Sequence, residues 1–294
     1  MRKVLLATTA LVAMSVTAAQ AADISISGYA EFAYNQINNA ENTMASDGGI
    51  VIKATTTTDS GITFTAVQDS KFEGTAAKPT ALDKIGASLN DSYVQASGDF
   101  GTLKMGASDT ALDSQDSSFT GRSLSIQGAG EVTGSKSTVL IGADSTAFNY
   151  TSPSINGLQL VGSIDEANNR TDIGGKYEIG GVTIGYQTRS SATDSTLVGV
   201  GVTMAGVRVQ AASVEHVTGA TKRKTSDVGF SYTMGDITLA GHTSKSTGSS
   251  TDKNNEIGVK YNVGGGASLR ATSYGNTVSG TDSTGFYSEF RVTF

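Results

Sequence analysis

The sequence predicts an all-β protein: a transmembrane, antiparallel, up-and-down β-barrel of about sixteen strands. Three observations predict this fold. Apolar and polar side chains alternate in segment after segment, the connections fall into two length classes, and charges avoid the apolar face. One long connection, the third long loop at about 108–144, is expected to fold inward.

The first 21 residues are expected to be a cleaved signal peptide outside the fold. Arg2 and Lys3 give a positive start, residues 4–19 are apolar and small, and Ala19-Gln20-Ala21 is a small-x-small cleavage site. A transmembrane anchor is the alternative, which the short apolar run disfavours. Residues 22–294 show no linker or shift in composition, so we interpret them as one barrel domain.

Charge and composition exclude several classes of function. After loss of Arg2 and Lys3, 19 basic residues face 27 acidic ones, a net charge of −8 (19 − 27). An acidic chain is not expected to bind nucleic acid. There is no cysteine, and the two histidines, His216 and His242, do not have the spacing of a zinc motif. We therefore expect no metal site and no cofactor.

Period-two alternation is clearest in residues 23–36. Even positions carry Ile24, Ile26 and Phe32, whereas odd positions are mostly polar. Alternation over more than about ten residues suits a strand that spans a membrane. The pattern recurs to the final segment, 282–294, and yields an even number of strands, as in bacterial outer-membrane barrels.

The connections support the same architecture. Short turns such as Gly180-Gly181 alternate with polar loops, expected at 37–48, 73–90, 218–224 and 247–253. Short turns at one rim, together with both termini, and long loops at the other describe a transmembrane barrel. A secreted sandwich or β-solenoid is the alternative, but it has no reason to sort its connections in this way.

The charges in the strands lie almost entirely on one face. Only Glu215 and Lys245, at strand ends, share a face with the apolar residues. Lysine or arginine facing lipid at the membrane midplane would cost about 2–4 kcal/mol. The charged face is therefore expected to be wet, and a barrel of about sixteen strands leaves an aqueous channel. Its predicted wall includes Lys104, Arg270 and Arg291.

The long insert is expected to narrow this channel. Inserts of this length without strand pattern are usually functional or disordered. It has five acids and two bases, a sum of −3 (2 − 5). The candidate constriction residues are Asp109, Asp113, Asp116 and Glu131 on the loop and Glu31, Lys53 (near mid-strand) and Glu289 on the wall. Each loop acid could equally be a solvated or hydrogen-bonded carboxylate, and calcium at the acidic loops remains an alternative.

Three stretches resemble the general diffusion porins of Gram-negative outer membranes, especially the alphaproteobacterial branch. They are 26–32 (ISGYAEF), 98–106 (GDFGTLKMG) and 150–158 (YTSPSINGL). The last strand, with Phe290, Val292 and Phe294, resembles the signal that the outer-membrane assembly machinery recognises. The resemblance covers the whole mature chain.

This resemblance implies a homotrimer of sixteen-stranded barrels in the outer membrane, each with its third long loop as an eyelet. Family eyelets set acidic loop residues against a basic wall cluster. Glu31 and Ala107 stand where relatives often carry arginine, so the wall opposite the loop is expected to be less basic here.

The expected function is a water-filled channel for passive diffusion of ions and small hydrophilic solutes, with mild cation preference. An enzyme is not expected, because the sequence lacks Gly-x-Ser-x-Gly and pairs neither histidine with a nucleophile. The alternatives are a substrate-specific channel, for which Phe119 is the one aromatic residue in the loop, and a non-conducting barrel serving as surface anchor or enzyme. The basic stretch Thr221–Lys224 could contact outer-membrane lipid and lipopolysaccharide, or be merely solvated.

Overall fold

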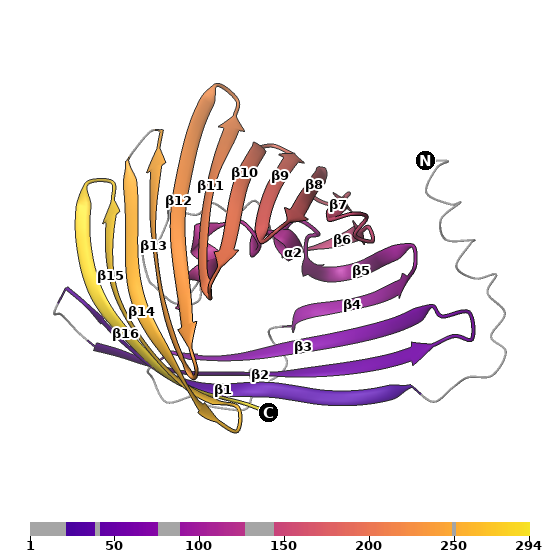
Figure 1. The fold of residues 1–294 in the computed structure, drawn as a ribbon, viewed down its shortest axis with the longest axis horizontal. Helices are drawn as coiled ribbons and strands as arrows, with labels where there is room; N and C mark the ends of the chain where they lie inside the picture. Colours follow the sequence, from indigo (N-terminus) through magenta and orange to yellow (C-terminus); the bar gives the residue numbers. More distant parts are fainter. Residues whose placement is uncertain (1–21, 39–41, 76–88, 127–143, 249–250) are drawn as a thin grey trace.

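The structure is a computed structural model, described here for residues 22–38, 42–75, 89–126, 144–248 and 251–294. Sixteen strands form a closed barrel in which every described pairing is antiparallel (Figure 1). Each strand pairs with its neighbours in sequence, and β16 closes the barrel on β1 through Glu31, which faces Arg291. The predicted fold class and strand number are confirmed.

The strand bounds are as follows: β1 Asp23–Ile37, β2 Asn42–Thr57, β3 Thr63–Thr75, β4 Leu89–Gly98, β5 Gly101–Asp109, β6 Asp144–Thr151, β7 Leu158–Asp165, β8 Arg170–Ile179, β9 Val182–Ser190, β10 Asp194–Met204, β11 Val207–Thr218, β12 Thr221–Met234, β13 Ile237–Thr247, β14 Asp252–Gly264, β15 Ala267–Val278 and β16 Thr281–Thr293.

The apolar face predicted from the alternation is the outer face of the barrel. Large apolar side chains there are exposed, for example Ile173 at 59% and Ile257 at 62%. On the same strands the inward positions carry buried polar groups such as Asp172 and Asn254. An exposed apolar belt around a closed barrel is the surface that faces lipid. A sandwich, which would bury this face, is excluded.

Three of the predicted polar loops were placed wrongly, because the strands extend further than their apolar parts. Residues 37–48 and 218–224 are mostly strand, and 247–253 overlaps strands at both ends: β2 begins at Asn42, β12 at Thr221, and β13 ends at Thr247 before β14 begins at Asp252. Backbone pairing continues past the apolar belt, where polar side chains on both faces carry no lipid penalty. In the fourth, β3 reaches Thr75 and β4 begins at Leu89, with 76–88 outside the described residues.

These extensions also change the list of outward charges. Lys222, Lys224 and Lys253 have the outward parity of their strands and join Glu215 and Lys245 on that face. The expectation that only two strand charges lie there was therefore wrong. These five, together with Asp109, Asp194 and Asp282, which have the same outward parity, lie at the strand ends remote from the chain termini.

The long insert begins and ends where it was expected, between the end of β5 and the start of β6. It contains α2 (Asp113–Asp116) and the 3-10 turn η2 (Gly121–Leu124). Figure 1 shows α2 beside β8–β10, on the concave side of the strands. Residues 127–143, including Glu131, lie outside the described part. No described helix is long and apolar enough to cross a membrane.

Candidate pore constriction

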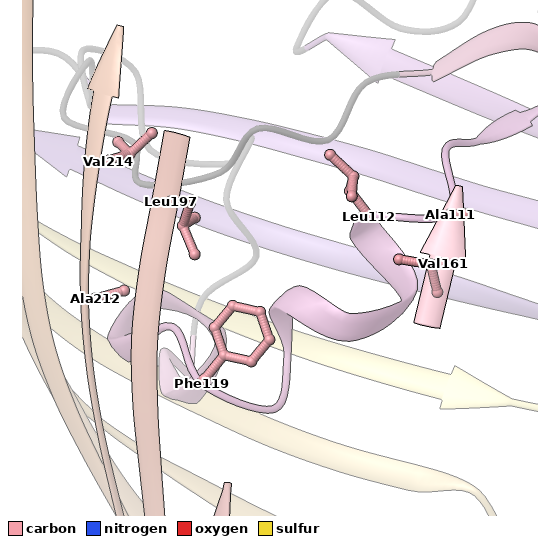
Figure 2. Packing of buried hydrophobic residues seen from close by; sticks show 7 residues of the cluster. All are labelled: Ala111, Leu112, Phe119, Val161, Leu197, Ala212 and Val214. Atoms are coloured by element: carbon pink, nitrogen blue, oxygen red, sulfur yellow. The ribbon is translucent and has the colours of Figure 1, made fainter. Parts of the chain in front are cut away.

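The described part of the insert, 110–126, is seated on the inner wall by a small apolar cluster (Figure 2). Leu112 and Phe119 are completely buried against Val161, Leu197 and Val214 from β7, β10 and β11. Burying a side chain of this size stabilises by about 1.5–3 kcal/mol. The insert is thus attached to the wall by a dry contact.

Six glycines of the wall lie directly beneath the insert. Gly185 and Gly199, inward positions of β9 and β10, flank the ring of Phe119, and a Cβ on either would overlap it. Gly229 of β12 meets the backbone of Gly121 just as closely. Gly174, Gly201 and Gly258 similarly accommodate Leu112, Ser118 and Ile126. We call these six wall residues the glycine track.

Hydrogen bonds fix the first half of the insert along this track. The Ala111 N–H donates to Ser163 Oγ at 2.9 Å. The Gln187 side-chain amide donates to the Leu112 carbonyl at 2.9 Å, and that of Gln115 donates to the Gln159 carbonyl at 3.2 Å. Residues of β7 and β9 therefore bind the backbone at the start of the insert.

The second half is bound in the same way. The Ser117 carbonyl accepts hydrogen bonds from Arg208 at 2.9 Å and Gln210 at 3.0 Å. Asp227 Oδ2 accepts the Arg122 N–H at 2.8 Å, and Ser125 donates to Glu256. From β7 to β14, the wall holds the insert inside the barrel, where it narrows the lumen.

The predicted loop acids occupy different environments. Asp109 is exposed at the end of β5, Asp113 is half-buried at the start of α2, and Asp116 is 3% exposed. The Asp116 carbonyl accepts the N–H groups of Phe119 and Thr120, so this residue helps to shape the turn. Glu131 lies outside the described residues. No group of three potential metal-binding side chains occurs within the described ranges.

The opposite side of the lumen, formed by β1–β4 and β16, carries no part of the described insert; we call it the free wall. Glu31 and Glu289 both face inward there, and each has an arginine partner. Arg291 lies 3.1 Å from Glu31 and stacks 3.9 Å from the ring centroid of Tyr29. Arg270 of β15 lies 3.4 Å from Glu289. These predicted wall charges therefore form partly neutralised pairs.

Two lysines complete the predicted set. Lys104 Nζ lies 5.0 Å from the ring centroid of Tyr93, an attractive cation–π arrangement. Lys53 is exposed and faces Ser25, two residues after β1 begins. It therefore lies toward the short-turn rim, and the expectation of a mid-strand position was wrong, because β2 begins earlier than its apolar part.

Sequence reasoning missed three lumen-facing acids as candidate site residues: Asp47, Asp69 and Asp91 on β2, β3 and β4. Asp47 lies directly opposite Glu31 in the register of β1 and β2. Asp47 was expected in a loop, although it has the same alternation as residues 49, 51 and 53, which face the lumen on β2. Glu31, Asp47, Asp69 and Asp91 therefore present one acid on each of four neighbouring strands.

The three residues of the proposed C-terminal assembly signal share the outer face. Phe290 is 45% and Phe294 66% exposed, and Val292 lies between them with the same parity. Gly28 N–H donates to the Phe294 carbonyl at 2.9 Å, and a Cβ on Gly28 would lie 2.9 Å from the Phe294 ring. The last residue thus completes the barrel seam over β1.

Comparisons with solved structures agree with this geometry. Two engineered variants of the Rh. blastica porin match with TM-scores of 0.70 and 0.69, each at 18% identity over 92% of this chain and 100% of theirs. A further porin structure gives 0.66 at 17% identity with the same coverage. No curated protein matches the chain. The family model described as "Gram-negative porin" matches residues 7–282. The chain therefore belongs to the Gram-negative porin family, whose barrels are outer-membrane channels for passive diffusion.

Proposed function

We propose that this porin admits ions and small hydrophilic solutes and prefers cations mildly. The observation that carries the preference is the set of inward acids Glu31, Asp47, Asp69 and Asp91, one on each of the four strands β1–β4 of the free wall. Charged side chains that line a narrow aqueous pore set its ion selectivity. Arg291 offsets Glu31, which is why the preference is mild.

Reversal potentials in planar bilayers under a salt gradient test this proposal. The unmodified channel is expected to favour cations. Replacing two acids, Asp47→Asn with Asp69→Asn, should move the reversal potential toward zero by removing negative charge from the lumen. Asp282→Asn is the matched control, because Asp282 is exposed on the outer face of β16 and bonded to Thr277. Anion selectivity of the unmodified channel would refute the proposal.

We infer that the barrel has no enzymatic activity. Ser195 Oγ lies 2.7 Å from Nδ1 of His216, and within the described ranges this is the one arrangement that resembles a nucleophile and its base. The residue that faces His216 on β12 is Arg223. Activation of serine requires a third group that orients the base and stabilises its cation, and an arginine disfavours that cation. We expect the unmodified protein to hydrolyse activated esters no faster than a Ser195→Ala variant does.

A general channel is favoured over a substrate-specific one. Phe119, the aromatic residue of the insert, is fully buried in the wall cluster and faces away from the lumen. No other aromatic residue occurs in 108–126. A sugar-specific channel would need aromatic rings exposed along its path. Conductance that stays proportional to salt and is not blocked by sugars would support this conclusion.

The assembly and location follow from the same proposal. We infer cleavage after residue 21, insertion through the assembly machinery by the Phe290–Val292–Phe294 face, and association into homotrimers. The exposed apolar belt supports insertion, and the contact between Phe294 and Gly28 supports a role for Phe294 in closing the barrel. The mass of the mature chain and conductance steps in threes would test processing and trimerisation.

The channel is proposed to work without a cofactor. Calcium at the acidic loops is the remaining alternative, and it would bind carboxylate oxygens. Treating the purified channel with a chelator should leave conductance and heat stability unchanged. If the chelator lowers conductance or heat stability and added calcium restores it, the ion has a structural role.

A further inference from the structure

On the outer surface of β11–β14, outward residues that are paired across the four strands form rows. From one row to the next, toward the rim remote from the chain termini, these rows change from apolar to basic. The first row is Val209, Phe230, Gly241 and Ile257. Two residues higher on each strand, about 7 Å, come Ala211, Val228, Thr243 and Asn255. The next row is Ser213, Ser226, Lys245 and Lys253, and above it Glu215 faces Lys224.

The apolar part of this surface is hollowed. Gly241 has no side chain, and the outward side chains of Val209, Val228, Phe230 and Ile257 surround it. They line an open depression of about 310 Å³. Such a depression within the lipid-facing belt accepts an acyl chain more closely than the flat belt beside it.

The basic row above the depression is unusual for a β-sheet. Lys245 and Lys253 lie directly opposite each other on β13 and β14, both outward and exposed. Like charges in this position destabilise a sheet. Neither lysine forms an ion pair with an acid of the described chain, whereas Lys222 is paired with Glu215 at 3.2 Å. A bound anion between the two ammonium groups would remove the repulsion.

Thr243 and Asn255 lie between the depression and the lysines, and the hydroxyl groups of Ser213 and Ser226 lie beside the lysines in their own row. Thr243 donates to Asn255 Oδ1 at 2.7 Å, and Ser226 donates to Ser213 Oγ at 3.2 Å. These groups can exchange partners with sugar hydroxyls. The order of apolar depression, polar row and basic row matches a lipid with acyl chains, a sugar headgroup and phosphate. A plain phospholipid has no sugar for the middle row.

We propose that this surface binds a phosphorylated glycolipid of the outer leaflet. Its phosphate is held between Lys245 and Lys253, with Lys224 beside it, and one acyl chain lies in the depression at Gly241. This inference rests on the proposed outer-membrane location, which places this rim in the outer leaflet, and deepens it by assigning the lipid-binding residues. It is independent of ion selectivity.

Native mass spectrometry of the full mature chain tests the proposal, with bis-phosphorylated lipid A as the probe. The double variant Lys245→Gln with Lys253→Gln is expected to bind it about tenfold more weakly, because two charge-assisted hydrogen bonds are lost. The matched control, Lys53→Gln with Lys260→Gln, removes two inward lysines and should bind as the unmodified chain does. Dephosphorylated lipid A should bind as weakly to the unmodified chain as lipid A does to the double variant.

Equal binding by the double variant, or equal binding of the dephosphorylated lipid, would overturn the proposal. Phosphatidylglycerol bound as tightly as lipid A would also overturn it, since the middle row would then contribute nothing. The heat-induced shift in electrophoretic mobility confirms that each variant forms the barrel. Loss of conductance with lipid binding retained would count against the proposed function and not against this site.

Discussion

The two sides of the lumen differ although one alternating pattern builds both. The side under the insert, β7–β14, offers glycines, amides and buried acids that hold another piece of chain. The free wall offers the partly exposed acids Asp47, Asp69 and Asp91 to the lumen, beside Glu31, which is buried against Arg291. Period-two alternation decides which side chains face inward. What lies in front of each strand decides how large and how polar those side chains are.

Under the proposed function, this difference allows one side of the barrel to hold the insert and the other side to set ion selectivity. At the positions of the glycine track, even the methyl group of an alanine would overlap the insert. The glycines therefore leave room for the insert to lie against the wall. On the free wall, the partly exposed carboxylates of Asp47, Asp69 and Asp91 are proposed to act on passing ions. Variants that disturb one side only can separate narrowing from selectivity.

The largest effect is expected from filling the glycine track. Gly229→Leu places a side chain where the Gly121 backbone now lies. Overpacking of this kind costs about 1–3 kcal/mol of stability. Here the insert can remove the steric overlap by detaching from the wall. We expect single-channel conductance to fall by about half or more, with frequent closures, as the released insert enters the lumen.

The control for this variant is the same substitution at Gly162. That glycine lies on the outer face of β7, and the nearest atom to an added Cβ is 3.6 Å away. Gly162→Leu should leave the conductance unchanged. If both variants conduct alike, the insert is not held by the track in the way proposed.

A smaller effect is expected from removing the side chain that the track accommodates. Phe119→Ala should cost about 3–5 kcal/mol of packing, while the hydrogen bonds of Ser117 and Arg122 to the wall remain. We predict an unchanged mean conductance with greater open-channel noise. Phe148→Ala, which removes a phenylalanine that is 51% exposed on the outer face, is the control. Equal noise in both variants would contradict an anchoring role.

The fold could be predicted from the sequence because lipid outside and water inside impose opposite demands on alternate residues. Ile173 and Asp172 show this, since one side chain is exposed outward and the next is buried inside. Strand ends were harder to predict. At Lys222–Lys224 both faces meet water, so alternation no longer shows whether the backbone remains paired.

The site was predicted less well, because its chemistry depends on contacts between distant strands. Asp116 was expected among the charges of the pore but is buried, and Glu31 was not expected to pair with Arg291 across the barrel seam. The glycine track was visible in principle. Gly174, Gly185, Gly199, Gly201, Gly229 and Gly258 all fall on the wet parity, away from turns, where glycine otherwise weakens a strand.

The smallest effect is expected at Lys53, which sharpens the boundary of the free wall. Lys53→Gln removes an exposed cation near the short-turn rim, where water and salt screen it beyond about 8 Å at physiological ionic strength. Reversal potentials should move slightly toward cations in dilute salt and not at all in molar salt. If the shift equals in size that of the Asp47 and Asp69 variant, selectivity is set at the short-turn rim. The acids of β1–β4 would then not be the main determinants of ion selectivity. At one salt concentration, two charges shift the reversal potential equally only if they lie equally close to the path of the ion.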